Sequence, residues 1–401
     1  MLRLLTAGES HGRALVGIIE GVPSNLELNA EYINHQLHRR QQGYGRGGRM
    51  KIETDRVEIL TGVRHGKTIG SPISLVIWNR DFENWGEKMA AEPVKVEIEK
   101  VLIPRPGHAD LVGKYKYGYD DIRNVIERAS ARETAMRVAL SAVARRLLSE
   151  LGVRIGSHVF SIGNAGYKDR EELDSMLAKM MKLEHGAEEI AIEADDSEVR
   201  CLDKSIADRM IQQIKRAKKL GDTLGGIVEV FVTGLPIGLG SYVEFDRKLD
   251  GQLAQAMMSI HAIKGVEIGE GFRNATLFGS EVHDEILLRN KKIVRPTNRA
   301  GGLEGGITNG QPLWIRAAMK PISTLMKPLK SIDLSKMKTI EARRERSDFC
   351  AVPAAGVVAE NVAAPVLANA ILEKFGGDSI GELKERYSRE AFFGSTVVKT
   401  Q

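Results

Sequence analysis

Aromatic residues, cysteines and long apolar runs are all scarce in this sequence. Aromatic residues make up only 5% of the chain, which weakens any model of nucleic-acid binding by base stacking. The two cysteines, Cys201 and Cys350, have no metal-ligand spacing around them. A disulfide framework is therefore excluded and a reducing compartment is favoured.

No apolar run approaches the roughly 18 residues that a membrane-spanning helix needs. The opening stretch MLRLLTAGESHG turns polar after five residues, so it resembles neither a signal peptide nor an anchor. We therefore expect a cytoplasmic protein with no membrane partner.

The net charge of +5 is small for 401 residues. It argues against a general nucleic-acid coat and favours local positive patches for small anions. Hydrophobic residues at 42% and charged residues at 28% are ordinary for a globular chain with ample material for a core.

Positive charge gathers in RRQQGYGRGGRM, residues 39–50, which holds four arginines, four glycines and no acidic side chain. Three interpretations compete: an RNA-binding arginine-glycine tract, a dinucleotide-binding turn, and an anion-binding loop of an active site. Gly43, Gly45 and Gly48 satisfy G-x-G-x-x-G, but a helix is expected before them and a strand after them, the reverse of a dinucleotide fold. The tract occurs once and is flanked by regular structure, which disfavours the RNA interpretation. From this loop alone, a folded anion site and a solvated basic turn are equally favoured.

Hydrophobic periodicity predicts strands mixed with long helices. Strands are expected at 2–8, 15–22, 50–63, 73–79 and 225–240. Helices are expected after an N-cap at Asn29, over 121–152, near Asp246, and over 354–377 with a bend at Pro365. The charged stretch near 163–200 is interpreted as a peripheral excursion. The pattern favours a single α+β domain over residues 1–401 with antiparallel sheets.

Reactive or cationic side chains recur in loops along the whole chain. The segments are GESHG at 8–12, PRPGHADL at 104–111, ERASARET at 127–134, GGLEGGITNG at 301–310, KPIST at 320–324 and ERSDFCAVPA at 345–354. Each alone has an ordinary explanation, such as an exposed turn or a local ion pair. Together in one chain they indicate a charged active site.

In order and over nearly the whole chain, the sequence resembles the chorismate synthase family. The matching motifs are GESHG at 8–12, RRQQGYGRGGRM at 39–50, RPGHAD at 105–110, ERASARET at 127–134, AQAMMSIHAIKGVEIGEGF at 254–272, GGITNG at 305–310 and RSD at 346–348. The resemblance implies a single-domain sandwich of antiparallel β-sheets and helices, assembled as a homotetramer. It also implies an anti-1,4-elimination of phosphate from 5-enolpyruvylshikimate 3-phosphate that gives chorismate and requires reduced FMN without net redox change. This substrate carries two carboxylates and a phosphate, which would explain an acid-free arginine loop.

The resemblance further implies which residues form the site. The implied catalytic groups are His11 near the leaving phosphate, His108 at the flavin's pyrimidine edge, and Asp348 in proton removal. Substrate binding is implied for Ser10, Arg40, Arg46, Arg49, Arg105 and Arg132. Flavin binding is implied for Arg128, Ser130, Ala131, His261, Ala262, Gly305, Gly306, Lys320, Pro321, Ile322, Ser323, Thr324 and Arg346. His261 is expected to contribute only its backbone, and no metal is expected.

The expected source of electrons is a separate flavin reductase, with NADPH at most an indirect donor, because the glycine motif stands in the wrong order for a dinucleotide fold. One alternative from another class stays open here, an RNA-binding protein built on the arginine-glycine loop. Tight binding of FMN in the presence of substrate would distinguish the two.

Overall fold

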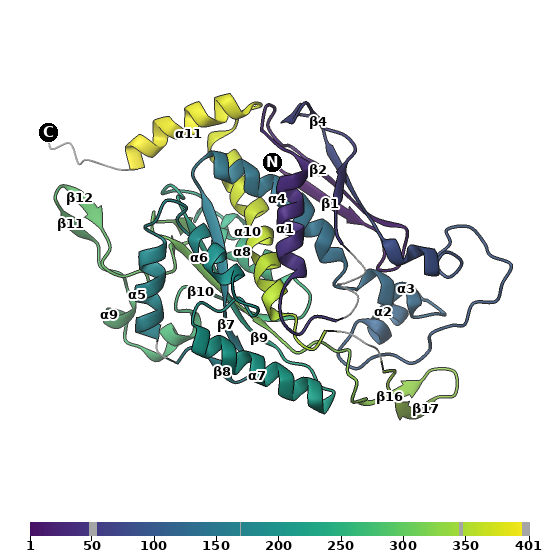
Figure 1. The fold of residues 1–401 in the computed structure, drawn as a ribbon. Coiled ribbons are helices and arrows are strands. Elements are labelled where there is room, and N and C mark those ends of the chain that lie inside the picture. The colour runs from purple at the N-terminus through teal and green to yellow at the C-terminus, as the bar shows by residue number, and fades with distance from the viewer. Residues whose placement is uncertain (48–53, 169, 345–347, 395–401) are drawn as a thin grey trace.

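Two antiparallel sheets lie on either side of a layer of helices (Figure 1). The computed structural model describes residues 1–47, 54–168, 170–344 and 348–394. The four-stranded sheet has the order β1 (Arg3–Ala7), β2 (Ala14–Glu20), β6 (Ile73–Trp78) and β3 (Val57–Ile59). The five-stranded sheet has the order β10 (Ile263–Ile268), β15 (Leu313–Met319), β9 (Gly226–Thr233), β7 (Arg154–Ile162) and β8 (Ala165–Gly166). Neighbouring strands in both sheets run antiparallel, which confirms the predicted α+β class.

Short hairpins extend from this framework. They are β4 (Val63–Arg64) with β5 (Lys67–Thr68), β11 (Leu287–Arg289) with β12 (Lys292–Val294), β13 (Leu303–Glu304) with β14 (Ile307–Thr308), and β16 (Lys330–Asp333) with β17 (Lys338–Glu341).

The helices between the sheets are α1 (Ala30–Gln41), α4 (Glu133–Glu150), α8 (Leu249–Met258) and α10 (Val352–Phe375). Helix α4 packs on β1, β2 and β6, whereas α10 packs on β7 and β9 and against α4. Gly17 in β2 permits the close approach of α4, since a Cβ at this position would lie only 2.6 Å from the sulfur of Met136. One hydrophobic cluster runs through both sheets and this layer, from Leu2 to Tyr387.

The remaining helices lie around this centre. They are α2 (Asp110–Tyr117), α3 (Arg123–Arg128), α5 (Arg170–Met180), α6 (Glu188–Asp195), α7 (Lys204–Leu220), α9 (Gly279–Val282), α11 (Ile380–Gly394) and the 3-10 turns η2 (Arg80–Asn84), η3 (Phe245–Arg247) and η4 (Gly271–Thr276). Within the charged stretch 163–200, α6 packs directly on β7, and Ile190 of α6 is fully buried.

Several expected elements form, and three differ from the expectation. Asn29 caps α1 by accepting a hydrogen bond from the Tyr32 N–H at 2.9 Å, as predicted. The helix predicted over 121–152 is instead two helices, α3 and α4, interrupted at residues 129–132. The strand predicted over 50–63 is, within the described residues, only β3.

The third difference concerns α10, which is 24 residues long and apolar enough to cross a membrane by length and composition. The expectation that no such run exists was therefore wrong. Burial explains this composition, because 83% of the helix's most apolar window lies inside the protein. The helix also continues through Pro365 as one element.

Candidate active site

The interruption between α3 and α4 turns the ERASARET segment toward the loop that contains GESHG. The Ser130 hydroxyl donates to the Ser10 hydroxyl at 3.1 Å, and Ser10 is only 4% exposed. The Ala131 carbonyl accepts a hydrogen bond from Arg40 Nη2 at 3.0 Å. The same carbonyl also accepts the Thr134 N–H at 3.1 Å, so it serves the first turn of α4 and Arg40 together.

Two buried arginines meet at one buried carboxylate beneath these loops. Arg40 Nη1 lies 3.4 Å from the Asp55 carboxylate, which also pairs with Arg132. Arg132 donates to the Asn79 side-chain carbonyl from Nε at 3.0 Å and from Nη2 at 2.9 Å. Asn79 in turn donates to the Gly12 carbonyl at 2.7 Å. The arginine pair and the GESHG loop therefore form one hydrogen-bonded unit.

Burial and neighbouring charges both act on Arg40 within this unit. Burial is the main cause that lowers the pKa of Arg40 to about 10, and the charges of Arg46 and Arg132 add to it. Asp55 and Asp348 oppose this shift without cancelling it. Arg40 remains charged near neutral pH, so a bound polyanion would relieve the repulsion among the arginines.

His11 lies at the edge of this unit against a carboxylate and an aromatic ring. Its Nδ1 is 2.9 Å from the Glu127 carboxylate, whose side chain is fully buried. Its ring stacks on Trp85 with centroids 4.0 Å apart. The His11 side chain is 20% exposed, so the ring can still meet a ligand.

His108 belongs to a second unit, built by the PRPGHADL segment. Its Nδ1 lies 2.5 Å from Asp110, whose side chain is fully buried. Arg105 donates to the same carboxylate from its backbone N–H and from Nε, each at 2.9 Å. Burial alone would raise the pKa of Asp110, but the hydrogen bonds from His108 and Arg105 outweigh it and hold the pKa well below its usual range.

Arg46 and Asp348 form a third unit. Arg46 Nη1 lies 3.1 Å from the Asp348 carboxylate, which also accepts the Gly47 N–H at 2.6 Å. Gly45, in the left-handed region with φ of 93°, accepts the Phe349 N–H at 2.8 Å. The arginine-glycine loop therefore reaches the RSD segment. The predicted residues Arg49 and Arg346 lie outside the described residues.

The KPIST loop connects the second unit to the segment around His261. Lys320 Nζ donates to the Gly107 carbonyl at 2.6 Å, and the Lys320 N–H donates to the Ala262 carbonyl at 2.9 Å. The Ile322 carbonyl accepts from the Thr223 hydroxyl at 2.7 Å. In contrast to these inner residues, Pro321 is exposed.

His261 has a buried ring nitrogen that lacks a partner. Within the described part of the chain, its Nδ1 has no hydrogen bond. Burial is the main cause that lowers the pKa of His261, and its charged neighbours include Glu133, His108 and Arg128. Arg128 itself donates to the Gly8 carbonyl at 3.1 Å. His261 therefore lies between the first two units.

The predicted pair Gly305 and Gly306 lies at the far end of α8 from His261. These glycines form the turn between β13 and β14, and the Gly306 carbonyl accepts from the Leu249 N–H at 2.9 Å, where α8 begins. His261 follows the last turn of this ten-residue helix, which spans about 15 Å. The turn therefore does not touch the His261 segment.

Four side chains of the three units were missed at the level of sequence: Asp55, Asn79, Asp110 and Glu127. Asp110 and Glu127 stand inside the quoted motifs, and Asp110 is two residues from His108. That short spacing was a usable signal. Asp55 and Asn79 have no local pattern, because their contacts join distant segments.

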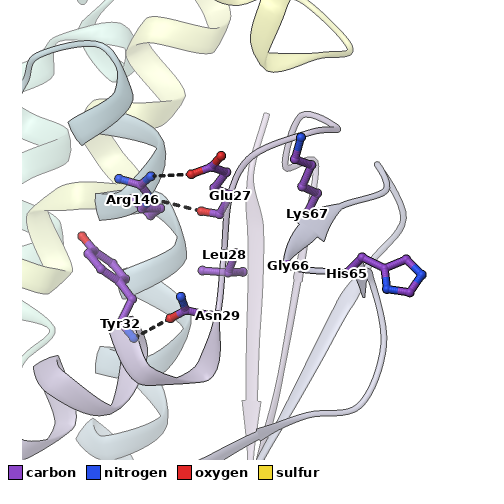
Figure 2. Close-up of a pocket in the computed structure, with 8 residues that line it drawn as sticks. All are labelled: Glu27, Leu28, Asn29, Tyr32, His65, Gly66, Lys67 and Arg146. Carbon is purple, nitrogen blue, oxygen red and sulfur yellow. Dashed lines mark hydrogen bonds and ion pairs between the residues drawn. The ribbon is translucent and has the colours of Figure 1, made fainter.

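A cavity of about 320 Å³ lies elsewhere, between the start of α1, α4 and the β4–β5 hairpin (Figure 2). Its lining is Glu27, Leu28, Asn29, Tyr32, His65, Gly66, Lys67 and Arg146. Its Arg146 Nε donates to the Glu27 carbonyl at 3.0 Å. The lining contains no predicted site residue, so this cavity is not the candidate site.

The helices enclosed by antiparallel sheets define a protein of the α+β class. Its arginines, serines and histidines come from distant loops and are joined in hydrogen-bonded units, an arrangement suited to a small anion. The family model for chorismate synthase matches residues 2–372, and the chain belongs to this family.

Two curated relatives and one solved structure show how close the similarity is. The chorismate synthase of Chlorobaculum tepidum is 58% identical over 388 residues, which cover 96% of each chain. The chorismate synthase of Alkaliphilus metalliredigens is 54% identical over 388 residues, 96% of this chain and 98% of that relative. A crystal structure of chorismate synthase superposes with a TM-score of 0.78 at 45% identity and covers 98% of both chains.

Proposed function

We propose that this chain catalyses the anti-1,4-elimination of phosphate from 5-enolpyruvylshikimate 3-phosphate to give chorismate, as a carbon–oxygen lyase of the shikimate pathway. The observation that carries the proposal is the buried pair Arg40 and Arg132 around Asp55, joined to Ser10 and the His11 loop, in a chain of the chorismate synthase family. The RNA-binding alternative receives no support from the relatives.

Substrate binding is assigned to the arginines. Arg40, Arg46, Arg105 and Arg132 would meet two carboxylates and one phosphate, with Arg49 as a further candidate outside the described residues. A hydrogen bond to a charged group contributes roughly 1.5–3 kcal/mol, so several such bonds would offset desolvation of the substrate. Ser10 would add its hydroxyl as a further hydrogen-bonding group for the substrate.

Proton movements are assigned to three side chains. His11 would donate a proton to the leaving phosphate, since a histidine is a suitable acid near neutral pH. Asp348, held by Arg46 and the Gly47 N–H, would assist removal of the substrate proton. His108, fixed by Asp110, would manage protonation at the edge of the flavin.

The residues between the first two units suit a flavin. His261 presents a buried, unbonded ring nitrogen among the described residues, and Lys320 adds a cation beside Gly107. Arg128, Ser130, Ala131, Ala262, Ile322, Ser323 and Thr324 would complete the contacts, with Pro321, Gly305, Gly306 and Arg346 as further candidates. Reduced FMN would supply electron density that assists departure of phosphate without net redox change. An unbonded Nδ1 also suggests that His261 offers its ring as well as its backbone.

The wider proposals concern assembly and electron supply. We propose a single domain over residues 1–401, a homotetramer, a cytoplasmic location and a separate flavin reductase. Leu5, Val16 and Ile18 support assembly, because these apolar side chains lie exposed on neighbouring strands β1 and β2, with Leu5 opposite Ile18. Burial between copies would remove that apolar surface from water.

Light scattering tests the assembly. Ile18→Glu should yield a smaller species than the wild type, whereas Arg64→Glu in the exposed β4 hairpin should not. An unchanged mass for Ile18→Glu would remove this face from the interface.

The activity test is an anaerobic phosphate-release assay with chemically reduced FMN and 5-enolpyruvylshikimate 3-phosphate. Phosphate and chorismate should appear in equal amounts. No turnover by folded, FMN-binding protein would overturn the proposed function.

A further inference from the structure

A single buried carboxylate holds both the backbone and the ring of His11. Glu127 Oε2 accepts the His11 N–H at 2.8 Å and lies 2.9 Å from Nδ1, while Oε1 lies 3.1 Å from Nδ1. The Glu127 carbonyl also accepts the Ser10 N–H at 3.0 Å. One residue at the end of α3 therefore fixes two successive positions of the GESHG loop.

The ionised state of Glu127 decides which nitrogen of His11 carries a proton. Burial would raise the pKa of Glu127, but the hydrogen bonds and charge of His11 and the charge of Arg123 outweigh it and lower the pKa. An ionised carboxylate only accepts hydrogen bonds, so Nδ1 must be the donor. The other nitrogen, Nε2, remains available to exchange a proton with a ligand.

Trp85 fixes the plane of the ring. The two rings are inclined by only 25°, and the Arg123 guanidinium lies 5.1 Å from the Trp85 centroid. Arg123 also pairs with Glu127 at 3.4 Å. His11 Nε2 lies 4.0 Å from Asp81, so this edge of the ring faces away from Glu127.

We propose that Glu127 is a positioning residue for the acid step: it keeps a proton on His11 Nδ1 throughout and thereby directs Nε2 to the leaving phosphate. This inference rests on the proposed function. As the carbon–oxygen bond breaks, its electron pair leaves with phosphate, the Nε2 proton passes to a phosphate oxygen, and the ring is left neutral with its Nδ1 proton still bonded to Glu127. The electron-poor carbon is compensated when the C–H bond at the other end of the allylic system loses its proton with help from Asp348, because the electron pair of that bond then shifts to form the new double bond.

Glu127→Gln tests this directly, because an amide can reverse the hydrogen bond. The Gln carbonyl can still accept the His11 N–H, while its NH₂ group would donate to Nδ1. His11 would then carry its proton on Nε2 and be held in the neutral form. Glu127→Asp keeps the carboxylate and serves as the rescue variant.

NMR of protein labelled with ¹⁵N at histidine reports which ring nitrogen is protonated, without substrate or turnover. We expect Nδ1–H in the wild type and Glu127→Asp, and Nε2–H alone in Glu127→Gln. In the reduced-FMN assay, kcat should fall about a hundredfold in Glu127→Gln, a typical contribution of a positioned acid, with KM nearly unchanged and a partial recovery in Glu127→Asp.

The matched control is Glu229→Gln, since Glu229 is a fully buried partner of His158 at 2.8 Å and belongs to no unit of the site. It should lower the melting temperature and leave kcat unchanged. An Nδ1–H ring in Glu127→Gln, or normal kcat despite Nε2–H, would overturn the inference. Absence of turnover in the wild type would instead count against the proposed function and leave the NMR result standing.

Discussion

At the scale of one residue, Arg46 allows the contribution of charge to substrate binding to be distinguished from the contribution of side-chain geometry. Its side chain is 11% exposed, contacts Asp348, and contributes to the charge around Arg40. Arg46→Lys keeps the charge and loses the planar fork, so substrate affinity should fall about tenfold, or about 1.4 kcal/mol. Calorimetric titration with substrate at modest salt measures this, with Arg64→Lys on the exposed β4 hairpin as the control. Equal affinity in Arg46→Lys and wild type would show that charge alone suffices.

Individual site residues also differ in whether they could be predicted from the sequence. His11 and His108 were predicted because each stands in a recognisable motif. The Glu127–His11 contact joins positions 116 residues apart, and no periodicity or spacing indicates such a pair. Only the fold, by ending α3 beside the GESHG loop, brings them together.

At the scale of elements, α10 is anchored by one carboxylate in its middle. Glu360 is fully buried and contacts Arg39 at 2.8 Å, Arg145 at 2.7 Å and Arg200 at 2.9 Å. Burial would raise the pKa of Glu360, but the three guanidinium groups outweigh it and hold the pKa well below the ordinary 4.5. The ion-pair network therefore stabilises the fold at pH values above 4.5. This stabilisation is lost as the pH falls below 4.5 and the Glu360 carboxylate becomes protonated.

Glu360→Gln should lower the free energy of unfolding at pH 7 by about 3–5 kcal/mol, because it leaves buried guanidinium charge uncompensated. Between about pH 5 and pH 3 the variant should lose less stability than the wild type, since it lacks the carboxylate that becomes protonated. Denaturant unfolding at several pH values measures both effects. The control is Glu373→Gln, because Glu373 also lies on α10 but forms an exposed pair with Arg247. It should change neither the stability at pH 7 nor its dependence on pH. Parallel pH curves for Glu360→Gln and wild type would contradict the argument.

The contact between β2 and α4 is equally open to test. In Gly17→Ala the new Cβ would lie 2.6 Å from Met136 Sδ and 2.8 Å from a Leu140 methyl carbon, so overpacking should destabilise the protein by about 1–3 kcal/mol. Gly265→Ala in β10 is the matched control, because its nearest neighbour is 3.6 Å away. Urea unfolding compares them. Equal stabilities would mean that α4 shifts at no measurable cost.

Most helices and strands could be predicted from the sequence, but the break between α3 and α4 could not. Helical periodicity over 121–152 is continuous, and Ala129 and Ala131 are strong helix formers. The break coincides with bonds from outside the segment, namely Arg40 to the Ala131 carbonyl and Ser130 to Ser10. Tertiary contacts therefore override local preference at the residues assigned to the site, as is common at functional sites.

At the scale of the whole molecule, the order of the elements bears on how the proposed reduced flavin is supplied with electrons. Gly43 and Gly45 of the glycine motif follow α1, and the next described strand is β3, so the order is opposite to that of a dinucleotide fold. We expect no chorismate when protein, oxidised FMN, substrate and NADPH are mixed anaerobically. Adding dithionite to the same mixture should start the reaction and serves as the control. Sustained turnover on NADPH alone would show that the chain reduces its own flavin.

Arg39 and Arg40, neighbours in the last turn of α1, point into different parts of the protein: Arg39 to Glu360 in the core, Arg40 to Asp55 in the site. Successive helical residues are rotated by about 100°, so the phase of α1 decides which arginine serves which place. Inserting or deleting one residue in this helix would disturb core and site together. The rotation of this one helix therefore couples the integrity of the core to that of the site.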